Sequence, residues 1–253
     1  MIQIGDPSLL HDLEREFTGR TGLGTSAYRI TPRSPWPSEL FALFCLGRTV
    51  GVLAWLESGT YHGQAADVLA RAMPEATVRT VEIDHDIGIV ARARLAWAGD
   101  RVAVLGGADG AEWLPRLASG GHDLSPSGPI GAFIDGPKGM AAAILARKLL
   151  DDYPAVRFVG CHDMARSVMG RAVPARAALQ EIGTWDSDRW CWATDDEEWV
   201  ARTAHLDDGL REAHVTEDAR SGWRPYEHFA VGQPTLPMRS YGPTIMVLGR
   251  GPR

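Results

Sequence analysis

Between about residue 50 and residue 165, short apolar runs alternate with segments that carry the apolar spacing of amphipathic helices. The runs that predict strands are residues 50–57, 77–84, 100–107, 129–136 and 155–163. The segments that predict helices are residues 63–73, 87–99, 109–118, 139–153 and 164–179. Strands joined through helices of this length pair in parallel, with helices on both faces of the sheet. The alternation therefore predicts an α/β fold with a doubly wound, mostly parallel sheet.

The two ends of the chain are less regular than this central block. Residues 9–17 predict a short helix, after which glycine and proline residues interrupt the pattern. We expect residues 1–45 to form an N-terminal appendage or lid, and residues 46–253 to form the main domain. Within that domain, segment 180–240 has weak periodicity and predicts insertions, and residues 242–250 predict a last strand.

The composition argues against several classes of function. The formal net charge of -6 gives no basic footprint of the kind that nucleic-acid-binding proteins carry. No uninterrupted apolar stretch reaches about 18 residues, and no secretory signal pattern opens the sequence. The three cysteines, Cys45, Cys161 and Cys191, have neither the number of a disulfide framework nor the spacing of zinc ligands. We therefore expect a cytoplasmic protein that binds neither nucleic acid nor membranes.

Acidic side chains follow all five predicted strands of the central block. They are Glu57, Glu82 with Asp84, Asp109, Asp135, and Asp163 beside His162. In an open parallel sheet, ligands bind outside the carboxyl ends of the strands, where these loops converge. Because like charges repel and folding needs none of these acids, the set indicates a cationic or hydroxyl-rich ligand, or a metal ion.

The loop LESGTYHGQ, residues 56–64, argues against a dinucleotide. A phosphate-binding fingerprint, G-x-G-x-x-G, has glycine where this chain has Glu57, whose carboxylate would repel a phosphate. Gly59 and Gly63 keep the turn open for a ligand with a positively charged centre. Glu82, at the end of the second predicted strand, stands where a carboxylate can bind both hydroxyls of a ribose.

The motifs E-S-G-T-Y-H-G, V-E-I-D, G-A-D and F-I-D-G-P-K, in this order and spacing, resemble those of class I S-adenosylmethionine-dependent methyltransferases. Within that family the chain is most similar to small-molecule O-methyltransferases of the catechol and caffeoyl-CoA type and of the macrolide-sugar type. The resemblance covers roughly residues 50–165. Tyr61 replaces the middle glycine of the commoner E-x-G-x-G-x-G motif, as it does in those branches. The resemblance implies a Rossmann-like sheet of seven strands, with residues 180–240 as acceptor-side insertions of the methyltransferase domain.

The resemblance also implies a site for S-adenosylmethionine. Glu57, Gly59 and Gly63 would line the pocket of the methionine moiety, with Tyr61 in the same turn, and Asp135 would lie beneath the sulfonium. Glutamate at this place has a simpler interpretation, in which Glu57 only caps the helix that follows.

The ribose and adenine would lie at the ends of the second and third strands. The resemblance implies that Glu82 holds the ribose, that Ile83 packs against the adenine, and that Ala108 and Asp109 lie at the adenine edge. Glu82 as a solvated turn acid and Asp109 as a helix N-cap remain open alternatives.

Asp135, Lys138 and His162 are the expected catalytic residues. The resemblance places Asp135, His162 and Asp163 where metal-dependent members bind a divalent ion such as Mg²⁺, and Lys138 where catechol-type enzymes have a lysine that assists hydroxyl deprotonation. A histidine at this position departs from an all-oxygen ligand set, which Mg²⁺ prefers, and leaves His162 available as a general base. Lys138 could equally be a surface lysine, and His162 and Asp163 ordinary loop residues.

The expected function is methyl transfer to a small-molecule acceptor, at a hydroxyl oxygen, with a homodimer as a further expectation from the family. A non-catalytic S-adenosylmethionine-binding protein and, with less support, an NAD-type oxidoreductase are the alternatives. The aromatic candidates for an acceptor wall or lid are Trp185, Trp190, Trp192 and Trp199 and, within residues 221–242, Trp223, Tyr226 and His228. For the four tryptophans a place in the core or at a subunit contact is the favoured interpretation.

Overall fold

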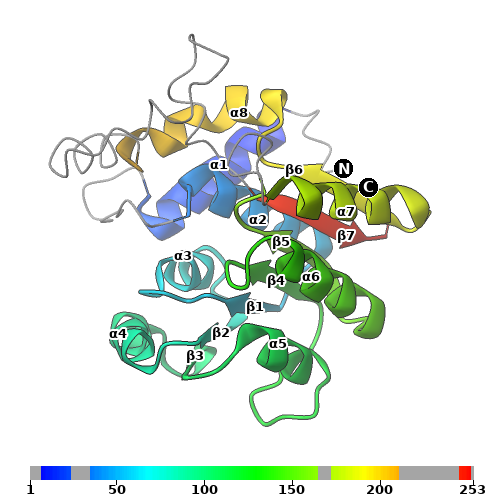
Figure 1. The fold of residues 1–253 in the computed structure, drawn as a ribbon. Coiled ribbons are helices and arrows are strands. Elements are labelled where there is room, and N and C mark those ends of the chain that lie inside the picture. The colour runs from blue at the N-terminus through cyan, green and yellow to red at the C-terminus, as the bar shows by residue number, and fades with distance from the viewer. Residues whose placement is uncertain (1–6, 24–34, 165–171, 211–244, 252–253) are drawn as a thin grey trace, which may run out of the picture.

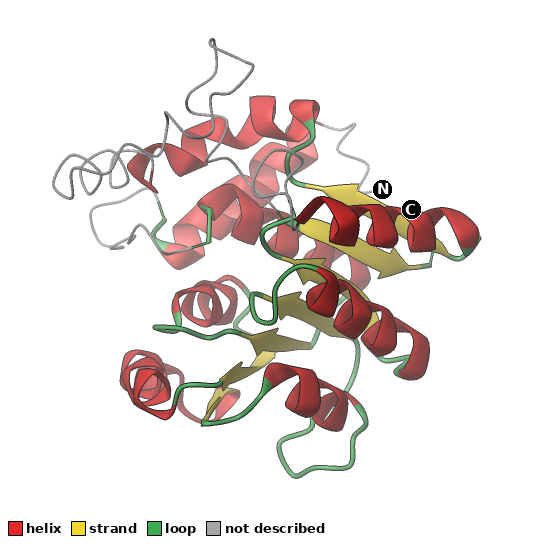
Figure 2. Ribbon diagram, viewed as in Figure 1, coloured by secondary structure: helices red, strands yellow, loops and turns green. Residues whose placement is uncertain are grey.

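The computed structural model of the chain describes residues 7–23, 35–164, 172–210 and 245–251. These residues form a seven-stranded sheet with helices on both faces (Figures 1 and 2). The strands are β1 Ala54–Ser58, β2 Thr77–Glu82, β3 Val102–Gly106, β4 Ile130–Ile134, β5 Val156–Cys161, β6 Arg189–Ala193 and β7 Met246–Arg250. The prediction of an α/β, doubly wound, seven-stranded sheet is confirmed.

The strand order is β3-β2-β1-β4-β5-β7-β6, and β7 runs antiparallel to both β5 and β6. The chain reverses its direction of travel across the sheet between β1 and β4, which are parallel neighbours. In folds of this class such a switch point opens a crevice at the carboxyl ends of the strands. The candidate acids therefore converge around the ends of β1 and β4.

The helices form two layers around the sheet (Figure 1). One layer contains α1 Pro7–Thr21, α2 Pro37–Val50, α3 Gln64–Ala72 and α4 His85–Leu95, which the turn η1 Ala96–Arg101 continues. The other contains α5 Gly110–Ala118, α6 Met140–Asp152 and α7 Ala172–Trp185, while α8 Glu197–Thr203 and η2 Ala204–Asp207 follow β6. Alternate strand residues fill the two cores, with Trp55 and Phe158 facing α1–α3, and Leu56 and Val159 facing α5–α7.

Helix α2 is the main difference from the sequence-based expectation for the N-terminal region. Pro37, which the sequence suggests as a helix breaker, occupies the first turn of α2, where proline is well tolerated. Gly51, with φ +66°, ends the helix, so β1 begins at residue 54 rather than at 50. Phe41 of α2 packs against Phe17 of α1 and Trp199 of α8, with ring centroids 5.3 Å and 5.6 Å away. The expected boundary at residue 45 thus falls inside a buried helix.

The aromatic residues after residue 180 divide between core and surface. Strand β6 was not expected from the sequence, and it buries Trp190, while Trp199 of α8 is fully buried. For these two residues the interpretation as core is confirmed, whereas Trp185 is 80% exposed. Trp223, Tyr226 and His228 lie outside the described residues. Among the helices of the described ranges, none is long and apolar enough to cross a lipid bilayer.

The first turn of α2 is fixed by an aspartate 169 residues further along the chain than its partner Ser38. Asp207 of η2 is buried, and its two carboxylate oxygens accept hydrogen bonds from the backbone N–H of Ser38 at 2.9 Å and from its hydroxyl at 2.7 Å. A carboxylate at a helix N-terminus satisfies free N–H groups and interacts favourably with the helix dipole. Asp207 therefore holds α2 in place beside α8.

Replacement of this aspartate tests the anchor. Asp207→Ala leaves the Ser38 donors buried without their acceptor, so we expect the free energy of unfolding to fall by about 2–3 kcal/mol. Urea unfolding followed by circular dichroism measures the change. Asp152→Ala, at the exposed last position of α6, is the matched control and should change stability by about 0.5 kcal/mol or less. Equal losses in both variants would contradict the proposed anchor.

Candidate functional site

The turn between β1 and α3 packs directly against the loop that follows β4. Gly59 has φ +81°, and a Cβ atom there would lie 2.8 Å from the backbone nitrogen of Gly136 and 2.9 Å from the carbonyl carbon of Asp135. Tyr61 and Gly63 also have positive φ angles, of 48° and 78°. Only glycine tolerates both this conformation and this contact at residue 59. The turn and Asp135 are therefore brought together by the backbone itself.

Glu82 ends β2 with its carboxylate turned toward the same turn. The side chain is buried, and its two oxygens accept hydrogen bonds from the backbone N–H of Tyr61 at 2.7 Å and of Asp84 at 3.0 Å. Each carboxylate oxygen has a second acceptor site. This fixed carboxylate can thus accept hydrogen bonds from a pair of hydroxyl groups, and it is not a freely solvated turn acid.

The predicted adenine-edge residues surround the end of β2. The side chain of Ile83 is 73% exposed, although it is large and apolar. Ala108 donates its backbone N–H to the carbonyl of Glu82 at 3.0 Å, which brings the end of β3 alongside. Asp109 caps α5 by accepting the N–H of Ala111 at 2.8 Å, so the capping role expected for it is present.

Glu57 is buried near the carboxyl end of β1 and lines a narrow cavity. The other residues around this cavity are Pro35, Gly59, Thr60, Tyr61, Gln64, Ala65 and Asp135. The Glu57 carboxyl is 1% exposed and accepts a hydrogen bond from the Thr80 hydroxyl, and α3 is capped by Gly63 without a side-chain bond. The alternative that Glu57 caps the helix is therefore not what the structure has.

Burial raises the pKa of the Glu57 carboxyl to about 8, against the hydrogen bond from Thr80. The carboxylates of Asp135 and Glu82 act in the same direction as burial. Because a buried carboxylate without a cation is costly, Glu57 holds its proton at neutral pH. A positively charged group in the cavity would favour loss of that proton.

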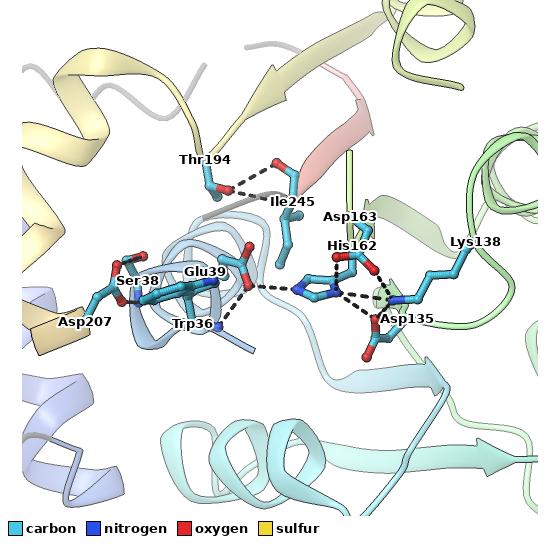
Figure 3. Close-up of polar contacts among 10 residues, drawn as sticks. All are labelled: Trp36, Ser38, Glu39, Asp135, Lys138, His162, Asp163, Thr194, Asp207 and Ile245. Carbon is cyan, nitrogen blue, oxygen red and sulfur yellow. Dashed lines mark hydrogen bonds and ion pairs between the residues drawn. The ribbon is translucent and has the colours of Figure 1, made fainter. Parts of the chain in front are cut away.

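Four charged side chains meet where β4 and β5 end (Figure 3). The Lys138 ammonium contacts the carboxylate of Asp135 and lies 2.6 Å from Oδ2 of Asp163. Nδ1 of His162 lies 2.8 Å from Oδ1 of Asp135 and 3.4 Å from Oδ1 of Asp163. All three predicted catalytic residues and the predicted metal ligands are therefore in one cluster, which argues against their being unrelated loop residues.

A fifth member of the cluster, Glu39, was not expected from the sequence. Its side chain is fully buried, and Oε2 lies 3.2 Å from Nε2 of His162 while accepting the backbone N–H of Trp36 at 2.9 Å (Figure 3). Glutamate at the third position of a helix commonly makes this return bond to the N-cap. The segment W-P-S-E contains this capping pattern. The pattern can be recognised only once a helix is known to begin at Pro37.

The cluster is a set of ion pairs at neutral pH. Burial alone would raise the pKa of Asp135, but His162 and Lys138 outweigh it and hold this pKa at about 2. Burial would likewise lower the pKa of His162, but Asp135 and Glu39 outweigh it and hold the pKa well above its usual range. The pKa of Lys138 is raised and that of Asp163 is lowered, because the opposite charges of the cluster outweigh burial at these residues too. An imidazolium cannot accept a proton, so this state of His162 favours a cationic role over that of a general base.

Glu57→Gln tests the buried carboxyl. The folded protein holds the proton of Glu57 up to a pKa of about 8 while an ordinary glutamate loses it near 4.5, so the contribution of this group to stability is lost as the pH rises between these values. We expect the unfolding free energy of Glu57→Gln, relative to wild type, to increase across this window by up to about 1.4 kcal/mol per pH unit. Urea unfolding at a series of pH values measures it.

Glu181→Gln, at an exposed position on α7, is the matched control and should follow the wild type at every pH. A Glu57→Gln curve parallel to that of the wild type would mean that Glu57 ionises normally in the folded chain.

Comparison with known proteins agrees with this architecture. No family model matches the chain. A stretch of 65 residues, 24% of this chain, is 40% identical to catechol O-methyltransferase B of Danio rerio, and the match spans 24% of the length of that relative.

Two solved structures align over nearly the whole chain. One is described as an O-methyltransferase from Klebsiella pneumoniae, with a TM-score of 0.51 and 17% identity over 95% of this chain and 90% of that one. The other is the O-methyltransferase TomG from Streptomyces achromogenes, in complex with S-adenosylmethionine, with a TM-score of 0.51 and 16% identity over 95% and 89% of the two chains. The chain thus has the seven-stranded fold of these class I O-methyltransferases.

Proposed function

We propose that this chain is an S-adenosylmethionine-dependent methyltransferase that methylates a hydroxyl oxygen of a small molecule. The observation that carries the proposal is that Asp135 belongs both to the cavity and to the charged cluster. This residue lines the narrow cavity with Glu57 and Gly59, and it also belongs to the charged cluster with Lys138 and His162. A donor on one side of Asp135 and an acceptor on the other would be adjacent, as direct transfer requires.

The cofactor would occupy the ends of β1, β2 and β3. Glu82 would accept the ribose hydroxyls, and the exposed side chain of Ile83 would be covered by the adenine, with Ala108 and Asp109 at its edge. The methionine moiety would lie in the turn formed by Gly59, Tyr61 and Gly63, beside Glu57. Bound S-adenosylmethionine in the similar TomG protein gives the proposal further support.

The acceptor oxygen would lie beside the cations of the cluster. Transfer is a displacement at a methyl carbon with a sulfonium leaving group, and alignment of the two reactants alone can supply roughly 7–11 kcal/mol. The hydroxyl proton would pass to solvent water, which reaches the cluster at the half-exposed Lys138. Lys138 and His162 would stabilise the negative charge that this loss leaves on the acceptor oxygen. Asp135 would hold both cations in position by accepting from each of them.

The alternatives differ from this proposal in specific ways. An NAD-type oxidoreductase would place a phosphate beside Glu57, where a buried carboxyl lines the cavity. A non-catalytic S-adenosylmethionine-binding protein would retain the cofactor site without turnover. We further propose a cytoplasmic location without nucleic-acid or membrane partners, in keeping with the net charge of -6, and homodimerisation stays a prediction.

The cofactor is tested by titration calorimetry with S-adenosylhomocysteine and, separately, NAD. We expect micromolar binding of the nucleoside, and a roughly ten- to hundredfold loss of affinity in Glu82→Gln because a charged acceptor for two hydroxyls is removed. Glu75→Gln, at an exposed position before β2, should bind as the wild type does. Binding of NAD in place of the nucleoside would overturn the proposal.

Catalytic roles are tested by turnover with a panel of phenolic and alcoholic acceptors. We expect His162→Gln to lower kcat by roughly 10²–10³-fold, because it removes a preorganised cation, while the affinity for S-adenosylhomocysteine stays within a few-fold. His11→Gln, at an exposed position on α1, is the matched control. Full turnover in His162→Gln and in Asp135→Asn would refute these roles but leave the cofactor site standing, and absence of turnover by the wild type on every acceptor would favour the non-catalytic alternative.

A further inference from the structure

The Lys138 ammonium lies at the point where the potential metal ligands converge. Asp135, His162 and Asp163 each offer one ligand atom, and these atoms lie within 4.8 Å of one another. The ammonium contacts Asp135, is 2.6 Å from Asp163, and is 3.4 Å from Nδ1 of His162 (Figure 3). A divalent ion bound by the three groups would need the space that this nitrogen fills.

We propose that Lys138 is the resident cation of this site, that it makes a divalent metal unnecessary, and that it selects acceptors which present a single oxygen. The inference rests on the proposed methyl transfer for the identity of the acceptor, but not for the position of the cation. Lysine would then act by binding the acceptor oxygen, rather than as a base assisting a metal.

The donor set itself fits Mg²⁺ poorly. Mg²⁺ prefers oxygen ligands in octahedral geometry, and one of the three groups here is an imidazole. Both ring nitrogens of His162 already face carboxylates, Nδ1 that of Asp135 at 2.8 Å and Nε2 that of Glu39 at 3.2 Å. An ion that used Nδ1 of His162 would have to displace its contact with Asp135, so two carboxylates remain as ligands, and the ammonium bridges them.

The choice of lysine supports the same conclusion. The chain has 26 lysine and arginine residues, of which only Lys138 and Lys148 are lysine. An ammonium is a compact point charge, whereas guanidinium is a planar fork that cannot occupy the position of an ion between converging ligands. Lys138 therefore stands at one of the two positions where this arginine-rich chain uses the compact cation.

The number of N–H donors limits the acceptor. An ammonium has three, and Asp135 and Asp163 take two of them. Nδ1 of His162, 3.4 Å from the ammonium, already faces Asp135 at 2.8 Å. Because the Lys138 side chain is 48% exposed, the third N–H can reach a ligand at the open side of the cluster. One N–H binds one oxygen, whereas a divalent ion has room for two. An isolated hydroxyl group fits this site without help from a neighbouring one.

Mn²⁺ titration followed by electron paramagnetic resonance tests the resident cation without relying on activity. We expect wild type and Lys148→Ala, the control at the other, exposed lysine, to leave Mn²⁺ free. Lys138→Ala opens the space and should bind one Mn²⁺ at least tenfold more tightly. Stoichiometric Mn²⁺ binding by the wild type, or no gain in Lys138→Ala, would overturn the proposal. Titration of the same proteins with S-adenosylhomocysteine reports separately on the proposed function.

Acceptor preference tests the second part of the inference. Wild-type turnover should be unaffected by EDTA, and phenols with one hydroxyl should be methylated at least as fast as the matched vicinal diols. Loss of turnover in EDTA that Mg²⁺ restores, or turnover of vicinal diols alone, would refute this part while supporting methyl transfer itself.

Discussion

The absence of a side chain at Gly59 is the constraint on which the site depends. The residue follows β1, and any Cβ atom there would collide with the backbone after β4. Because the turn and that loop touch, the cavity at Glu57 and the cluster around Lys138 share Asp135 as a common wall. The switch point of the sheet thus opens a crevice and also sets the distance between the cavity and the cluster. A direct transfer would need the donor in the one and the acceptor in the other to be adjacent.

A chain of polar contacts links this site to segments that are far apart in the sequence. Asp207 holds the first turn of α2 through Ser38, and the next residue of that turn, Glu39, faces His162, which in turn contacts Asp135 (Figure 3). Glu39 is bonded to its own helix N-terminus as well, so its carboxylate has little freedom. The acceptor side of the site is therefore supported by the N-terminal helices and by the region after β6, and not by the central α/β block alone.

Local pattern sufficed to predict the parallel strands and the convergence of Asp135 and His162 on one edge, because the carboxyl ends of parallel strands must meet there. Prediction from local pattern failed where an element depends on partners that are distant in the sequence. Within the described residues, strand β6 pairs only with β7, which follows it after more than 50 residues. The tryptophans of β6 also stand among acids that mask the alternation. The role of Glu39 was not predicted because helix α2 was not predicted. In the sequence, a proline at the first position of a helix cannot be told from a proline that ends one until the packing of the helix is known.

The excess of acids at this sheet edge distinguishes a sulfonium ligand from a phosphate. The acids are Glu39, Glu57, Glu82, Asp135 and Asp163, and the bases are Lys138 and His162. A phosphate would add to the excess, whereas a sulfonium would offset it. Glu57 itself holds its proton while no cation is near, because burial and the neighbouring carboxylates raise its pKa to about 8. A cationic donor in the cavity would draw off this proton, so binding and ionisation favour each other. Once the methyl group has left, the neutral thioether lacks that attraction, and the same carboxyl would then favour release of the spent cofactor.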